Sequence, residues 1–439
     1  MTSSNIAVVV LDTLRYDRFE KYFSWLDGIR FTNAYSTSHW TGSAHASLFT
    51  GRYPSEVGTT NKSRTLEWDG ATLPEALQRE GYTTRMFSTN MQIYVWDGWE
   101  RGFDERFGPG AREVQPVPEG VFDWSGFAET TEATGAKQYV NGLLQCLRGG
   151  YPVVPSLREG YRIKTTELMD TQAVMNRVQD TTFGDREFSF INIMDAHKPY
   201  NPPKVYRETD HSLGPEIEDG LADRVDNLDM IKRAYDKCAQ YISNAYRHLY
   251  TDLMDEFDYV ITLADHGEHL GEHGLWAHVY GLNPELTHVP LVISGQGVRS
   301  KTVNTPVSIL DVHRTVADMA GSNVDSRGQN LLGEIEPRDR LVEYHGLAPG
   351  RRQRFEAAGV GDRYEPMDRP LDAIVSADGY AHETHQDGLE VTGQWSHDEA
   401  SHRLDELLNS INRQQVTSAA DDTDVSDEVQ SRLEELGYV

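Results

Sequence analysis

Short apolar runs alternate along the chain with longer stretches whose apolar residues recur at helical spacing. The apolar runs predict buried strands at residues 6–11, 82–87, 188–194, 259–264 and 289–294. The helical spacing predicts helices at residues 73–80, 165–180, 228–257 and 307–321. Strands that alternate with helices build a mostly parallel sheet covered on both faces, so the pattern predicts an α/β fold.

The pattern changes near residue 340. Asp378-Gly379 and Asp387-Gly388 are turn signals, and they favour antiparallel strands at residues 371–382 and 388–391. A helix at 401–411, an acidic linker at 417–427 and a terminal helix at 428–436 are expected to follow. We therefore expect a large domain at residues 1–340 and a small subdomain at 341–439. Residues 100–185 are rich in glycine, proline and aromatic residues, and we expect an insertion there that shapes a substrate pocket.

Polar side chains follow the predicted strands, where each strand would end. Asp12 and Asn90 follow two of these strands, Asp195 and His197 follow a third, and the pair Asp265-His266 follows a fourth. In open α/β sheets, ligands bind beyond the carboxyl ends of the strands. The sequence therefore predicts that these side chains converge on one active site.

The segment TGSAHASLFTGRYP, residues 41–54, predicts a short helix that begins just after Thr41 and ends near Gly51. Free N–H groups and the helix dipole favour an anion at such a start. An oxygen nucleophile that must become an alkoxide would gain from this position. The alternative is that Thr41 only caps the helix.

The overall composition excludes several classes of protein. The net charge is −28 and the pI is about 4.9, so the surface repels nucleic acid and anionic membranes. Such a charge is typical of proteins from salt-loving organisms, although an acidic mesophilic protein is the alternative. No stretch approaches the length of a membrane span.

Other sequence features bear on the compartment. The chain opens directly into an apolar strand, with no secretion signal before it, and Cys146 and Cys238 make no disulfide framework. We therefore expect a cytoplasmic protein. Its oligomeric state is left open by the sequence.

Two carboxylates and an imidazole, Asp12, Asp265 and His266, would form an oxygen-rich metal site with Thr41 as the fourth ligand. Mn, Mg, Ca or Zn suits such ligands, and the metal would lower the pKa of the Thr41 hydroxyl. Further basic side chains could bind ester oxygens or protonate a leaving group. These are His45, His197, Lys198 and His278. Asp195, His197 and His278 could also be ligands of a second metal ion.

Taken together, these residues and the segments around them resemble the sulfatase family of the alkaline phosphatase superfamily. The matching segments keep the family's order and spacing through about three quarters of the chain. They are VVVLDTLRYD (residues 8–17), TGSAHASLFTGRYP (41–54), ALQREGYTT (76–84), NIMDAHKPY (192–200), ADHGEHLGEHGLWAH (264–278), VPLVISG (289–295) and VSILDVHRTVADMAG (307–321). The resemblance implies an alkaline phosphatase-like sheet sandwiched by helices, with a catalytic domain at 1–340 and a small C-terminal antiparallel subdomain.

The resemblance also implies roles for single residues. Asp12, Asp265 and His266 resemble the family's metal ligands, and Thr41 stands where the nucleophile stands. Further positions resemble substrate contacts: His197 resembles a substrate-binding histidine, His278 occupies a position that is lysine in many members, and Asn90 lies where members offer another contact.

Three departures from the family pattern matter. Sulfatases usually carry a cysteine at position 41, which is oxidised to formylglycine, and Thr41 cannot form that group. The threonine is like that of the superfamily's phosphodiesterases and phosphoryl transferases. His45 replaces an arginine, and Thr13 replaces a second aspartate, which weakens the case for the family's usual calcium site.

These observations predict a metal-dependent hydrolase of phosphoric or sulfuric esters that acts on a small-molecule, glycan or lipid ester. A formylglycine diol can eliminate sulfate through its second hydroxyl, but Thr41 has no such route, so the chemistry favours a phosphoester. The alternatives are a sulfate ester hydrolase that uses Thr41 directly, a phosphoryl-group transferase and a non-catalytic binding protein.

Overall fold

The computed structural model describes residues 4–108, 121–122, 124, 127, 136–157, 170–208, 213–386 and 388–414. Its main sheet contains β1 (Ile6–Leu11), β2 (Ile29–Tyr35), β3 (Thr83–Ser88), β4 (Glu105–Phe107), β5 (Glu187–Ile193), β6 (Tyr259–Leu263), β9 (His288–Gly295), β10 (Lys301–Val303) and β11 (Val307–Ser308). The strand order is β10-β2-β9-β6-β1-β5-β3-β4, and β11 pairs with β2.

The sheet is mostly parallel, as the sequence pattern predicts. β6, β1, β5, β3 and β4 run parallel to one another, whereas β9 runs antiparallel to both of its neighbours, β6 and β2. The apolar runs all became strands, each within about two residues of its expected bounds. The sequence pattern missed β2, because this strand alternates buried and half-buried residues and is not a continuous apolar run.

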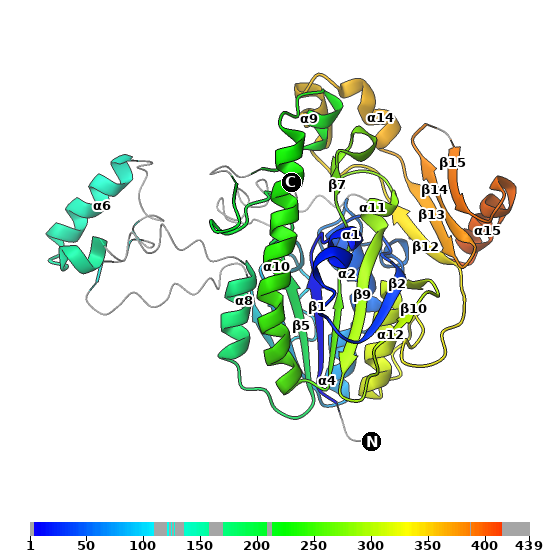
Figure 1. Ribbon diagram of the computed structural model, residues 1–439, viewed down its shortest axis with the longest axis horizontal. Helices are drawn as coiled ribbons and strands as arrows, with labels where there is room; N and C mark the ends of the chain where they lie inside the picture. Colours follow the sequence, from blue (N-terminus) through cyan, green and yellow to red (C-terminus); the bar gives the residue numbers. More distant parts are fainter. Residues whose placement is uncertain are drawn as a thin grey trace.

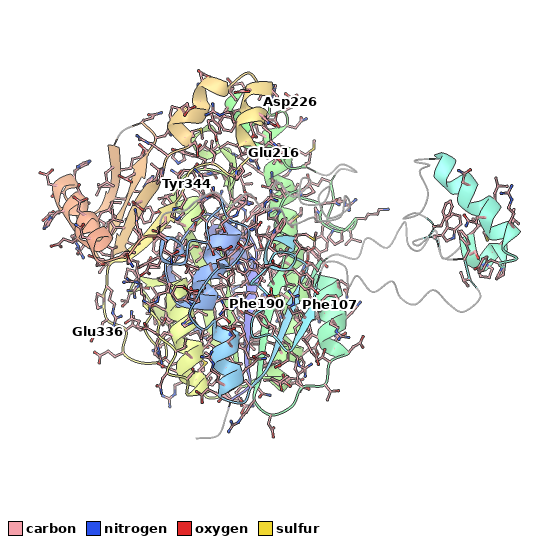
Figure 2. The ribbon with its side chains drawn as sticks, turned by 180° about the vertical axis from the view of Figure 1, so that it is seen from behind. Phe107, Phe190, Glu216, Asp226, Glu336 and Tyr344 are labelled. Atoms are coloured by element: carbon pink, nitrogen blue, oxygen red, sulfur yellow. The ribbon has the colours of Figure 1, made fainter. Side chains whose placement is uncertain are left out.

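Two layers of helices cover the sheet (Figures 1 and 2). One layer contains α1 (Tyr16–Tyr22), α8 (Asp170–Gln179) and α10 (Leu228–Glu256), and α10 contacts both of the others. The other contains α2 (Thr41–Thr50), α4 (Leu73–Arg79) and α12 (Ile309–Ala320). Phe190, in the middle of β5, lies inside this layered core (Figure 2) and is 1% exposed.

Shorter helices lie in the loops between these elements. They are α3 (Pro54–Val57), η1 (Met91–Ile93), α9 (Ile217–Leu221), η2 (Glu272–Gly274) and α11 (Pro284–Thr287). A further helix, α6 (Ala136–Arg148), stands apart from the layered body in Figure 1. Much of the expected insertion at 100–185 lies outside the described residues, so its expected part in a substrate pocket stays a prediction.

A separate antiparallel sheet follows the main domain. Its strands are β12 (Arg340–Tyr344), β13 (Leu371–Ser376), β14 (Gly379–Thr384) and β15 (Gly388–Gly393), paired in that order. The stretch 371–382, where the sequence predicts antiparallel strands with a turn signal at Asp378-Gly379, forms β13 and β14, which are joined by a turn at residues 377–378. Helices α13 (Arg351–Ala357), α14 (Tyr364–Met367) and α15 (His397–Asn409), with η3 (Gly361–Arg363), complete this part. The expected linker at 417–427 and terminal helix at 428–436 lie outside the described residues.

The register of the central strands brings their carboxyl ends to one edge of the sheet. Leu11 of β1 is level with Ile193 of β5, and Ser88 of β3 is level with Asn192. Each following loop therefore starts at nearly the same height above the sheet. Within the described part of the chain, none of the helices is both long and apolar enough to cross a membrane.

Candidate active site

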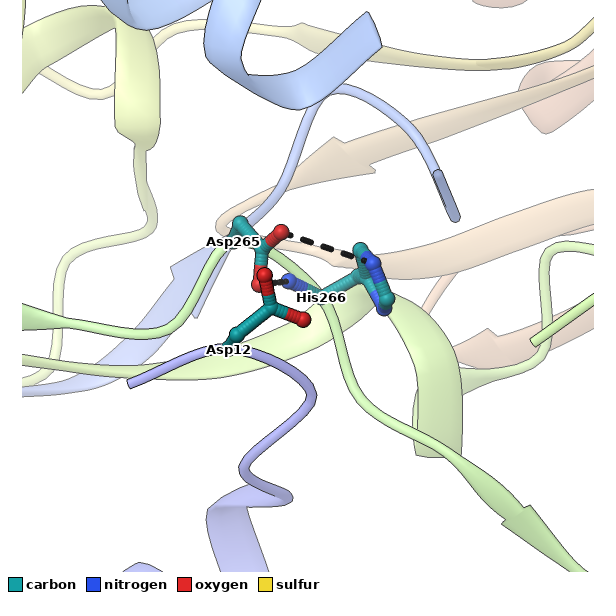
Figure 3. Close-up of side chains that lie close together, drawn as sticks. All are labelled: Asp12, Asp265 and His266. Carbon is teal, nitrogen blue, oxygen red and sulfur yellow. Dashed lines mark hydrogen bonds and ion pairs between the residues drawn. The ribbon is translucent and has the colours of Figure 1, made fainter. Parts of the chain in front are cut away.

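Three side chains meet above the carboxyl edge of the sheet, where β1 and β6 lie side by side (Figure 3). One ligand atom each from Asp12, Asp265 and His266 lies within 4.8 Å of the others. Asp12 directly follows β1, and Asp265 and His266 follow β6 after one residue. The sequence placed these residues together because parallel neighbouring strands end at the same edge.

Each carboxylate of this cluster carries one buried oxygen without a hydrogen-bond partner in the described part of the chain. These oxygens are Asp12 Oδ1 and Asp265 Oδ2. Burial raises the pKa of Asp12 to about 8 and the pKa of Asp265 to about 7. A buried carboxylate without a partner is costly unless a cation binds it. The donor set therefore fits a divalent metal ion.

Neighbouring groups hold the other two carboxylate oxygens in place. Asn90 Nδ2 donates to Asp12 Oδ2 at 2.7 Å, and Asn192 Nδ2 lies 3.4 Å from the same oxygen. The backbone N–H of Thr13 donates to Asp265 Oδ1 at 3.2 Å. These contacts turn the unsatisfied oxygens toward a common point. Groups that orient metal ligands in this way commonly matter for metal affinity.

Thr41 is the first residue of α2, and Trp40 occupies the cap position. Thr41 Oγ1 does not bond to the helix backbone as a cap would; it lies 3.0 Å from His266 Nε2. His266 Nδ1 donates to the carbonyl of Gly267 at 2.9 Å, so Nε2 of the neutral ring carries the lone pair. The Thr41 hydroxyl thus donates to the same nitrogen that belongs to the metal-ligand cluster.

His45 lies one helical turn after Thr41, and the protein itself engages both of its ring nitrogens. Nδ1 donates to the Thr41 carbonyl at 2.8 Å, and Asn192 Nδ2 approaches Nε2 at 3.4 Å. Burial lowers the pKa of His45 to about 3, so the ring is neutral. These bonds support the first turn of α2, and Asp265 Oδ2 lies 3.6 Å from Nδ1. The expected contact between His45 and substrate stays a prediction.

Two further imidazoles border the cluster. The ring centroid of His278 lies 4.5 Å from that of His266 and 5.0 Å from that of His197. Burial lowers the pKa of both, for His197 to about 3, so both rings are neutral hydrogen-bonding groups near pH 7. The rings of His266, His278 and His197 therefore form one contiguous group beside the two carboxylates.

Lys198 and Asp195 have other partners than those expected. Lys198 is 3% exposed, and its ammonium group pairs with Glu216, which in turn pairs with Arg351. The backbone N–H of Thr171 donates to Asp195 Oδ2 at 2.7 Å. Among the described residues, the cluster of Asp12, Asp265 and His266 is the one group of three or more ligands, so a second metal site gains no support.

Sequence reasoning assigned no role to two residues that the structure brings into the site. Asn192 lies inside β5, and only the pairing of β5 with β1 places it beside Asp12. Glu268 Oε1 lies 3.0 Å from His278 Nδ1. Glu268 is part of the Asp-His-Gly-Glu motif, but the motif does not reveal its contact with His278, because that contact depends on how the chain folds back. Asn90 was expected to contact substrate, which stays a prediction, and its amide donates to Asp12 Oδ2.

Comparison with known proteins identifies relatives over most of the chain. Residues 5–322 match the family model described as Sulfatase. An uncharacterized sulfatase of Escherichia coli K12 is 25% identical over 350 residues, which cover 73% of this chain and 66% of the relative. A choline-sulfatase of Rhizobium meliloti is 23% identical over 327 residues, which cover 67% of this chain and 61% of that protein. The chain thus spans less than two thirds of the length of these relatives.

The fold agrees with this match. A phosphonate monoester hydrolase from Silicibacter pomeroyi superposes with a TM-score of 0.65 at 17% identity, over 93% of this chain and 94% of that chain. At this identity the likeness concerns the fold alone. The family match covers the strands β1, β3, β5 and β6 and every metal-ligand candidate that they position. The chain belongs to the sulfatase family.

Proposed function

We propose that this chain is a metal-dependent ester hydrolase that uses Thr41 as its nucleophile and prefers phosphoesters. The observation that carries the proposal is the position of Thr41 Oγ1, at the start of α2 and 3.0 Å from His266 Nε2, beside two buried carboxylates with unsatisfied oxygens. In the sulfatase resemblance, Thr41 occupies the nucleophile position. Membership of the family supports ester hydrolysis, and the proposal adds the nucleophile and the substrate class.

The proposed metal ligands are Asp12, Asp265, His266 and Thr41. A bound divalent cation would neutralise negative charge on the reacting group and lower the pKa of the Thr41 hydroxyl. Two carboxylates with one imidazole suit Mn²⁺, Zn²⁺, Mg²⁺ or Ca²⁺, because the set mixes oxygen and nitrogen donors.

The residues of the chain then perform a two-step substitution. Thr41 gives its proton to water and attacks phosphorus, so that a bond from Oγ1 to phosphorus forms while the bond to the leaving oxygen breaks. The leaving oxygen takes up a proton from water. A water molecule next attacks phosphorus and gives a proton to Thr41 Oγ1 as the bond to Thr41 breaks, and the phosphate product departs. His197 and His278 would hydrogen-bond the oxygens of the transferred group.

The preference for phosphorus rests on the chemistry of residue 41. A formylglycine diol releases sulfate by eliminating through its second hydroxyl, and Thr41 has one hydroxyl only. We therefore propose that the chain contains no formylglycine. Water must then cleave the Thr41 ester directly, a reaction that is common for phosphoryl groups. Sulfate ester hydrolysis is the second candidate, favoured by the family and by the relative named as a choline-sulfatase.

The decisive experiment compares nitrophenyl phosphate, bis-nitrophenyl phosphate and nitrophenyl sulfate as substrates in high salt with Mn²⁺ or Mg²⁺. We expect phosphoester turnover that falls at least about 10³-fold in Thr41→Ala. Thr41→Ser keeps the hydroxyl and is the matched control. Acid quenching during turnover, followed by mass spectrometry, should find a phosphoryl group on the peptide that contains Thr41.

Each other result changes the proposal in a defined way. Turnover of nitrophenyl sulfate alone, lost in Thr41→Ala, would keep the nucleophile and reverse the substrate preference. Full activity in Thr41→Ala would remove Thr41 from the mechanism. Absence of turnover together with absence of bound metal would favour a non-catalytic binding protein.

A further inference from the structure

The loop after the metal ligands contains a buried carboxyl group with no place in the metal cluster. Glu268 is fully buried, and the cluster of ligand atoms among the described residues does not include it. A carboxyl group is costly to bury unless its contacts compensate. Its side chain contacts one residue of the candidate site, because Oε1 lies 3.0 Å from Nδ1 of His278.

A small hairpin sets this contact. Strands β7 (His269–Leu270) and β8 (Trp276–Ala277) are antiparallel, with His269 level with Ala277 and Leu270 level with Trp276. Continued by one residue beyond the His269–Ala277 pair, the same register places Glu268 opposite His278. Facing residues of an antiparallel pair have their Cβ atoms close together. The contact therefore follows from the hairpin geometry, although ten residues separate the two side chains along the chain.

The backbone of Glu268 is also fixed. Arg15 Nη1 donates to the Glu268 carbonyl at 3.1 Å, and Glu272 holds the same guanidinium at 2.8 Å. Gly267 lies so near α11 that a Cβ there would come within 2.0 Å of the Glu285 carbonyl oxygen. The Asp-His-Gly-Glu motif thus allows the chain to pass close to α11 between the metal ligands and Glu268.

We infer that Glu268 is a positioning residue, which holds the ring of His278 by Nδ1 so that the Nε2 edge faces the group bound between the metal ligands and Thr41. Rings that bind through one nitrogen are commonly oriented by a carboxyl group on the other. In this chain the hairpin places that carboxyl group against His278, which occupies the position that is a lysine in many members of the family. The inference rests on the proposed function, since it requires His278 to hydrogen-bond the transferred group.

A double-mutant cycle tests whether Glu268 acts through His278. We expect Glu268→Ala to lower kcat/KM for the preferred nitrophenyl ester about 10- to 100-fold. Glu268→Gln keeps an oxygen in the same place and should recover most of that loss. In a His278→Ala background, Glu268→Ala should have no further effect. Additive losses in the double variant, or equal losses in Glu268→Gln and Glu268→Ala, would overturn the inference.

A matched pair elsewhere in the chain provides the control. His382 Nε2 lies 3.7 Å from Glu390 Oε2 in the C-terminal sheet, outside the candidate site. Glu390→Ala removes that carboxylate–imidazole pair, and its kcat/KM should equal that of the unaltered chain. A loss in Glu390→Ala as large as in Glu268→Ala would assign the effect to general stability and would contradict the positioning role.

Nuclear magnetic resonance gives a readout that needs no turnover. In protein labelled with ¹⁵N-histidine, the His278 ring signals, assigned with His278→Gln, should report a single tautomer in the unaltered chain and an averaged one in Glu268→Ala. Unchanged signals in Glu268→Ala would refute the inference even if the chain hydrolysed esters. Changed signals in a chain without activity would support the positioning of His278 and count against the proposed function alone.

Discussion

At the scale of single residues, the site depends on polar contacts that bridge distant parts of the chain. Asp12 and Asp265 each carry one buried oxygen that lacks a hydrogen-bond partner among the described residues. Asn90, in the loop after β3, and Asn192, in β5, contact the other oxygen of Asp12. The residue types at the strand ends were visible in the sequence, because carboxylates rarely follow buried strands without a partner. The contacts of the two amides with Asp12 could not be seen in the sequence, because they depend on strand pairing.

The contact between Asn90 and Asp12 leads to a prediction about metal affinity. Asn90→Ala removes the N–H that donates to Asp12 Oδ2 at 2.7 Å, so the carboxylate is free to turn away from the cluster. We expect divalent metal affinity to fall about 10-fold or more, as measured by calorimetric titration of the metal-free protein. Asn244→Ala is the control. It removes an exposed hydrogen bond from the Asn244 amide to the Tyr206 hydroxyl and should leave the metal affinity unchanged. Equal affinities in all three proteins would contradict the orienting role of Asn90.

At the scale of elements, ion pairs connect the candidate site to the C-terminal part of the chain. Lys198, in the loop after β5, pairs with Glu216 at the start of α9, and Arg351 at the start of α13 pairs with both Glu216 and Glu218. Lys198 and Arg351 are each 3% exposed. Lys198 was expected to contact substrate from its place next to His197, but Glu216 at the start of α9 competes for its ammonium group. Sequence proximity to a site does not reveal such competition.

This ion network predicts a dependence of stability on pH. Burial by itself would raise the pKa of Glu216, but Lys198 and Arg351 outweigh it and lower that pKa from 4.5 to about 2. A lowered pKa in the folded state stabilises the protein above the unfolded value, and the contribution is lost as the pH falls through the folded value. We expect the free energy of unfolding to decrease by at most roughly 3 kcal/mol from this group as the pH falls from 4.5 toward 2.

Urea unfolding across that pH range checks the prediction. Glu216→Gln should remove this part of the pH dependence and should be less stable than the unaltered chain at neutral pH. Glu365→Gln breaks an exposed pair with Arg352 and serves as the control, with little expected change. The prediction is wrong if Glu216→Gln and the unaltered chain lose stability in parallel as the pH falls.

At the scale of the whole molecule, the excess of acidic residues dominates. The chain has a net charge of −28, and most of the charged side chains among its described residues are exposed or half-buried. Self-repulsion of this size weakens the compact state at low ionic strength. Ion pairs such as that of Arg403 with Asp339 in the C-terminal part offset only some of it.

We therefore expect the chain to be more stable in concentrated salt. The screening length is about 10 Å at 0.1 M salt and about 3 Å at 1 M, so charge repulsion is much weaker at the higher concentration. The melting temperature should rise between these conditions in both potassium chloride and sodium chloride. Trehalose at matched osmolarity tests for effects unrelated to charge. A melting temperature that stays constant or falls with salt would indicate an acidic mesophilic protein instead.

The sequence by itself determined the layered α/β fold, its main strands and the edge of the sheet where the candidate site lies. It could do so because apolar runs mark buried strands, and parallel strands must deliver their following residues to a common edge. It also determined the residues Asp12, Thr41, Asp265 and His266, which directly follow those strands or start a helix. These features depend on neighbours along the chain.

Only the tertiary structure decided which polar groups contact one another. The strand register placed Asn192 beside Asp12, the β7–β8 hairpin placed Glu268 against His278, and Glu216 drew Lys198 into an ion pair. The physical reason is that hydrogen bonds and ion pairs act over a few ångströms, whereas their partners here are separated along the chain by ten to 180 residues. Hydrophobic periodicity determines which face of an element is buried, but not which partner a polar side chain meets there.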